Sequence, residues 1–189
     1  MYREEAIALG MDVHDTIHSM KRRSPRHDYH KKGNYMVTLV VEGHVPLLGE
    51  MKGNADAPLD SPDAPHVEYS ELGDAILRDE IGKISQVFPQ VEVWKVCIMP
   101  DHIHMLVHVP PTSQLSDVIG HWKSYLATQK GIRFQVNFFD TRIRDTAHYA
   151  EKWNYICQNP VARGLVEAPR EWKYVIAFDP ATGEEREHR

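Results

Sequence analysis

The chain has 189 residues and a net charge of −5, with 42% apolar and 26% charged residues. This size fits one globular domain, and no apolar run reaches the roughly 20 residues that a membrane-spanning helix needs. The acidic N-terminus lacks the apolar core of an export signal, so we expect a cytoplasmic protein without a membrane partner. Two isolated cysteines, Cys97 and Cys157, argue against a disulfide scaffold or a cysteine zinc site.

Charge is distributed unevenly along the chain. Residues 21–32 contain six basic residues and one acid, whereas residues 49–71 contain six acids and Lys52 as their one base. We therefore expect a basic extension over 1–33, a folded domain over 34–178 with an acidic loop inserted at 49–69, and a polar tail over 179–189. Net charge alone argues against a non-specific DNA coat but says little about a local groove.

The first half of the chain predicts a short helix near 3–10, a buried strand from Tyr35, a long loop over 49–66 and a helix capped by Ser70. The apolar face of that helix is expected to consist of Leu72, Ile76, Ile81, Ile84 and Val87.

The second half begins with strands over 91–99 and 102–109, which a Pro100-Asp101 turn makes antiparallel. A helix follows and ends at Gly131, and one or two short strands are expected within 134–143. The last helix is predicted to begin at Asp145 or Thr146 and to end at Asn159-Pro160. The buried residues of the first of these helices are expected to be Leu115, Val118, Ile119, Trp122 and Leu126.

This order of elements predicts an α+β fold with a ferredoxin-like antiparallel sheet and helices mainly on one face. The second face of the sheet would be open and would leave room for a site.

Three histidines share one face of the predicted strand 102–109. Alternation places His102, His104 and His108 on the face opposite Ile103, Met105 and Val107, which should contact the helices. Neighbouring imidazoles on one strand face can bind one ion. The chain has twelve histidines, so the His-x-His pair is weak evidence by itself, and His108 lies far along the strand.

Tyr155 is the unusual residue of the last helix. Tyr149, Trp153, Ile156 and Cys157 form its apolar stripe, and Tyr155 lies about 200° around the helix from Trp153. Asn159 follows one turn later on the same side. The alternative is a surface tyrosine followed by an ordinary Asn-Pro helix end.

Four stretches resemble the single-tyrosine HUH transposases, in particular the REP-associated tyrosine transposases and their IS200-like relatives. They span about 35–175 and read YMVTLVVEGHVPLLG, CIMPDHIHMLVHV, FFDTRIRD, and YICQNPVARGLV with EWKY. The resemblance makes 34–178 the catalytic domain. The acidic loop and the order Val161-Ala162-Arg163 depart from the family pattern and bear on DNA specificity more than on chemistry.

The resemblance implies a site that cleaves and rejoins single-stranded or hairpin DNA through a 5′-phosphotyrosine on Tyr155. It implies that His102, His104 and Asn159, with Gln158 as fallback, hold Mg²⁺ or Mn²⁺. A homodimer is possible in such a family. Candidate DNA-binding residues are Arg22, Arg23, Arg26, Lys31, Lys32, Lys123, Lys130, Arg142, Arg144 and Arg163.

Two other functions remain open at this point. One is a non-catalytic nucleic-acid-binding module on a ferredoxin-like sheet, although such modules present aromatic residues on central strands rather than histidines. The other is a metal-dependent phosphodiesterase that activates water, for which Tyr155 is incidental.

Overall fold

The computed structural model describes residues 33–178, except 55, 59 and 65, together with 185–186. The short helix expected near 3–10, the basic segment 21–32 and most of the tail over 179–189 lie outside the described residues. Within the described part of the chain, no helix has the length and apolar character to cross a membrane.

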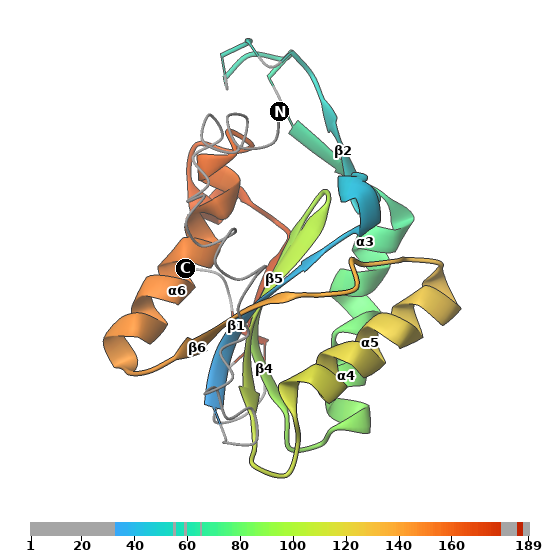
Figure 1. Cartoon of the computed structure of the whole chain (residues 1–189). Helices are drawn as coiled ribbons and strands as arrows, with labels where there is room; N and C mark the ends of the chain where they lie inside the picture. The colour runs from blue at the N-terminus through green and yellow to red at the C-terminus, as the bar shows by residue number, and fades with distance from the viewer. Residues whose placement is uncertain (1–32, 55, 59, 65, 179–184, 187–189) are drawn as a thin grey trace.

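One antiparallel sheet forms the centre of the molecule (Figure 1). Its strand order is β6-β1-β5-β4-β7-β8. The strands are β1 (Gly33–Val40), β4 (Glu92–Met99), β5 (His102–Val109), β6 (Phe139–Ile143), β7 (Val175–Phe178) and β8 (Glu185–Arg186). The predicted strands and the α+β class are confirmed, whereas β7 and β8 were not predicted.

Helices α3 (Glu71–Ala75), α4 (Gly82–Val87) and α5 (Leu115–Lys130) lie on one side of the sheet (Figure 1). A turn of π-helix, η2 (Ile76–Glu80), joins α3 to α4. Ser70 accepts a hydrogen bond from the Gly73 amide as the expected cap, and all five predicted core residues of α5 are buried. Val87 was wrongly predicted to be buried, because it lies in the last turn of α4 and is 50% exposed.

The second face of the sheet is covered by α6 (Thr146–Ala162), so the expectation of an open face is wrong along this helix (Figure 1). Ile156 of α6 packs with Cys97, Leu106 and Ile143 from three strands in a second apolar cluster. Apolar residues on both faces of β4 and β5 require cover on both sides, which gives three layers.

Two boundaries differ from the sequence prediction. The last helix continues through Pro160 to Ala162, because a proline in the final turn removes one hydrogen bond without ending the helix. The ends of the expected loop over 49–69 pair as β2 (Gly49–Lys52) and β3 (His66–Tyr69), a separate two-stranded sheet. Short 3₁₀ turns occur at η1 (Glu42–His44) and η3 (Pro169–Glu171).

Candidate active site

The histidine pair lies on β5 beneath α6. Both side chains are buried, and their Nε2 atoms face each other at 3.2 Å. The ring centroids are 4.7 Å apart and the rings are nearly perpendicular. The pair lies on the second face because Ile103 and Met105, which alternate with it, belong to the cluster under α3–α5.

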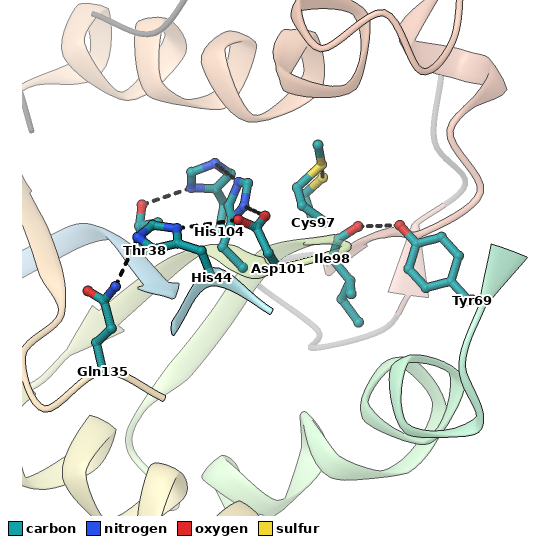
Figure 2. Close-up of polar contacts among 10 residues, drawn as sticks. Thr38, His44, Tyr69, Cys97, Ile98, Asp101, His104 and Gln135 are labelled. Carbon is teal, nitrogen blue, oxygen red and sulfur yellow. Dashed lines mark hydrogen bonds and ion pairs between the residues drawn. The ribbon is translucent and has the colours of Figure 1, made fainter. Parts of the chain in front are cut away.

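The Nδ1 atom of each ring has its own partner (Figure 2). The Nδ1 of His104 lies 2.8 Å from the Thr38 hydroxyl of β1, and the Nδ1 of His102 lies 2.6 Å from the Asp101 carboxylate. When both Nδ1 atoms carry the ring proton, both Nε2 lone pairs point toward the same small space. Such lone pairs repel unless a proton or a cation lies between them. Thr38 and Asp101 therefore orient the two rings in the way that outer partners orient metal-binding histidines.

Electrostatics favour a neutral His104 ring near the ionised Asp101 carboxylate. Burial lowers the pKa of His104 well below its usual value, and the positive charges of His102 and Arg163 lower it further. Burial would raise the pKa of Asp101, but its hydrogen bond to His102 and nearby positive charges outweigh burial and bring it to about 2. A neutral imidazole near an ionised carboxylate suits the binding of a cation.

Asn159 enters the same space from the last turns of α6. It is 9% exposed, and its Oδ1 is buried without a hydrogen-bond partner in the described structure. The amide nevertheless lies close enough to His104 to raise that residue's pKa. An unsatisfied buried oxygen beside two nitrogen lone pairs fits a third ligand of a bound ion, since unpaired buried polar atoms are rare.

Tyr155 lies one helical turn before Asn159 and against the histidine pair. Its ring centroid is 5.6 Å from that of His104 at an angle of 77°, and the side chain is 43% exposed. One chain therefore brings the phenol, both imidazoles and the amide together, with the phenol accessible from outside. Asp145 begins α6 by accepting a hydrogen bond from the His148 amide, which sets the start of this helix.

The two weaker candidates, the disfavoured His108 and the fallback Gln158, lie elsewhere. His108 is near the far end of β5, where its Nδ1 lies 2.7 Å from Asn34 Oδ1. Gln158, the fallback for Asn159, is exposed on α6. Among the described residues, no three His, Cys, Asp or Glu side chains could hold one ion, so a site here needs the amide oxygen.

The predicted DNA-binding residues have varied surroundings. Arg163 follows α6, and its charge acts on Asp101 and His104. Lys123 donates to the backbone carbonyls of Gln135 and Val136, while Lys130 pairs with Glu80 at 2.9 Å in the layer opposite the histidine pair. Arg142 and Arg144 lie on and just after β6. The other predicted residues, Arg22, Arg23, Arg26, Lys31 and Lys32, lie outside the described residues.

Sequence reasoning missed the residues that orient the pair. Asp101 also lies 3.5 Å from His44 Nδ1, and His44 Nε2 lies 3.1 Å from the Gln135 amide (Figure 2). The sequence could have indicated the role of Asp101, because this residue directly precedes His102 at a tight turn. Thr38 becomes recognisable only through the strand register that pairs it with His104.

Comparisons with known proteins show what this chain is similar to. Residues 76–149 match the sequence family described as "Transposase IS200 like". A Haemophilus influenzae protein described as a REP-associated tyrosine transposase is 29% identical over 122 residues, which cover 52% of this chain and 69% of that protein. A solved structure of a REP-associated tyrosine transposase bound to a REP hairpin superimposes with a TM-score of 0.57 at 22% identity, covering 82% of each chain, and shows the shared fold.

Proposed function

We propose that this chain, which is similar to the IS200-like and REP-associated tyrosine transposases, cuts and rejoins single-stranded DNA at the site formed by β5 and α6. The observation that carries the proposal is the convergence of Tyr155 with the buried histidine pair and the orphaned Asn159 oxygen.

Tyr155 is the nucleophile in this proposal. The Tyr155 hydroxyl oxygen attacks phosphorus, the bond from phosphorus to the 3′ oxygen breaks, and a 5′-phosphotyrosine and a free 3′-hydroxyl result. A second 3′-hydroxyl then attacks the phosphotyrosine and releases Tyr155. The covalent link conserves the phosphodiester bond energy, so joining requires no nucleoside triphosphate. A phenol is mostly protonated at neutral pH, so Tyr155 must lose its proton as it attacks.

His102, His104 and Asn159 would hold a divalent ion, Mg²⁺ or Mn²⁺, through two imidazole nitrogens and one amide oxygen. Imidazole ligands favour Mn²⁺ of the two. When bound, the ion would supply positive charge that aligns the scissile phosphate and offsets charge developing on its oxygens. Asp101 and Thr38 hold the two rings in the orientation this role needs.

The decisive experiment follows labelled hairpin DNA with a single-stranded flank in Mn²⁺ by denaturing electrophoresis. We expect a labelled covalent adduct with the native protein and loss of both adduct and cleavage with Tyr155→Phe, which keeps DNA binding. Tyr125→Phe is the matched control, since it removes a hydroxyl from α5, on the other side of the sheet, and should leave the adduct intact.

The alternatives give different results in the same assay. Cleavage retained by Tyr155→Phe without any adduct would indicate a phosphodiesterase that uses water. Binding without cleavage by the native protein on hairpin and single-stranded substrates would indicate a non-catalytic nucleic-acid-binding module.

A further inference from the structure

A polar hollow lies on the sheet away from the histidine pair. Its volume is about 470 Å³, and it lies where the start of β1, the start of β4 and the end of β5 meet. Its lining includes Gly33, Asn34, Glu92, Trp94, His108 and Arg142. His108 shares its strand face with His102 and His104, so the hollow opens onto the same side of the sheet as the candidate active site.

A β-bulge brings Trp94 to this face. Val93 pairs with Val107 and Lys95 pairs with Leu106, so Trp94 has no partner on β5. Such a bulge redirects a side chain. The Trp94 ring lies almost parallel to that of His108, with centroids 5.8 Å apart, and it meets the edge of Tyr149 from α6 at 5.6 Å. These rings form an aromatic wall of the kind on which unpaired bases stack.

The polar groups of the hollow suit the edges of bases. A carboxylate, an amide and a guanidinium are contributed by Glu92, Asn34 and Arg142, and these groups recognise the donors and acceptors of bases. Gly33 makes room for the arginine, since a Cβ there would lie 3.2 Å from Arg142 Nε. The Glu92 carboxylate accepts a hydrogen bond from Trp94 Nε1 at 2.9 Å and so holds the indole in place. Its negative charge also offsets that of Arg142, which favours a base over a phosphate in the hollow.

The distance to the candidate active site suits the same DNA strand. His108 is four residues from His104 along β5, or about 13 Å. Tyr149 is six residues before Tyr155 along α6, or about 9 Å. A strand whose phosphate lies at the histidine pair therefore reaches the hollow within a few nucleotides.

We propose that the hollow beside Trp94 binds one unpaired base of the DNA strand that flanks the scissile phosphate. This proposal rests on the proposed function, because it takes the substrate to be single-stranded DNA. The hollow would set which nucleotide is positioned relative to the cleaved bond, so it acts in site selection rather than in the chemical step.

The test is an abasic scan of the single-stranded flank, read by fluorescence anisotropy with Tyr155→Phe protein so that no DNA is cut. We expect one abasic position to weaken binding about tenfold, the size typical of one stacked base. Trp94→Ala should weaken binding to intact DNA by a similar factor. The Trp94→Ala protein should then bind DNA with that abasic position as tightly as it binds intact DNA. Trp94→Phe should retain most of the affinity.

The non-additivity of the two changes separates stacking from a general loss of structure. Phe88→Ala, directly after α4 in the opposite layer, is the control and should leave the abasic profile unchanged. If Tyr155→Phe protein binds DNA but Trp94→Ala weakens every position of the scan equally, the base site is wrong and the proposed function stands. If the protein binds no unpaired DNA, both proposals fail.

Discussion

Asp101 links the histidine pair to two other segments of the chain. Its carboxylate contacts the Nδ1 atoms of His102 and His44, and His44 in turn contacts Gln135. A carboxylate behind a ligand histidine fixes the ring and makes its other nitrogen a better donor. The orientation of the proposed ligands therefore depends on a residue outside the proposed ligand set.

Asp101→Asn should weaken Mn²⁺ binding by about 10- to 100-fold, because the amide keeps the size of the side chain but loses its charge. Isothermal titration with Mn²⁺ measures this change. Glu50→Gln, whose carboxylate pairs with Lys52 at 2.6 Å on β2, removes an acid elsewhere and should leave the affinity unchanged. Equal Mn²⁺ affinity of Asp101→Asn and the native protein would contradict this role.

Lys95 is a charged residue within the sheet that is fully buried. Its Nζ donates to Cys157 Sγ at 2.9 Å and lies 3.9 Å from the centroid of the Trp153 ring. Burial lowers its pKa from the usual 10.5, although Cys157 opposes this change. Between the lowered pKa and 10.5 the unfolded chain binds more protons than the folded chain, so this residue makes stability rise with pH across that window.

Lys95→Met should therefore raise the free energy of unfolding at pH 7 by about 1 kcal/mol, which is roughly 2–4 °C in Tm for a chain of this size. The difference from the native protein should shrink as pH rises toward 10.5. Thermal unfolding at several pH values tests this, with Lys173→Met as the exposed control. A Tm difference that is independent of pH would rule out the buried ammonium as its cause.

At the scale of elements, α6 carries both Tyr155 and Asn159 and lies directly over the histidine strand, whereas α3–α5 support the sheet from behind (Figure 1). The supporting layer is packed closely where α3 meets the segment before β2. Gly73 is buried there, and a Cβ would overlap the Leu48 carbonyl oxygen. Gly120 of α5 has open space at the corresponding position.

These two glycines predict opposite effects of the same substitution. Gly73→Ala should lower the free energy of unfolding by about 1–3 kcal/mol, because the clash is with backbone. Gly120→Ala should raise it by about 0.5–1 kcal/mol, because alanine favours a helix interior. Urea unfolding of both variants measures the contrast, and a stabilising Gly73→Ala would show that α3 can move away from Leu48.

At the scale of the whole molecule, β5 and α6 of one chain bring together all four proposed catalytic side chains. A second copy is not needed to complete this arrangement. The geometry therefore favours attack by Tyr155 on a phosphate held by the histidines of its own chain.

Mixing Tyr155→Phe protein with His104→Ala protein should consequently restore no cleavage of labelled hairpin DNA. Each variant lacks one half of the site, and in a self-contained chain neither can supply what the other lacks. Native protein diluted with each variant separately provides the activity scale. Recovered adduct in the mixture would indicate that α6 serves a partner's histidines.

The local sequence was enough to predict the central strands, the long helix α5 and the face of β5 that carries the histidines. Side-chain periodicity and turn residues act over a few neighbours, so they can be read without knowing the fold. The motifs around His102 and Tyr155 also carried the resemblance to the single-tyrosine transposases, to which the comparisons show similarity. Only the tertiary structure decided that α6 covers the histidine face and that Thr38 supports His104. It also decided that the two ends of 49–69 pair with each other as strands. These features depend on contacts between residues distant in the chain, whose pairing follows from how the layers pack and not from local pattern.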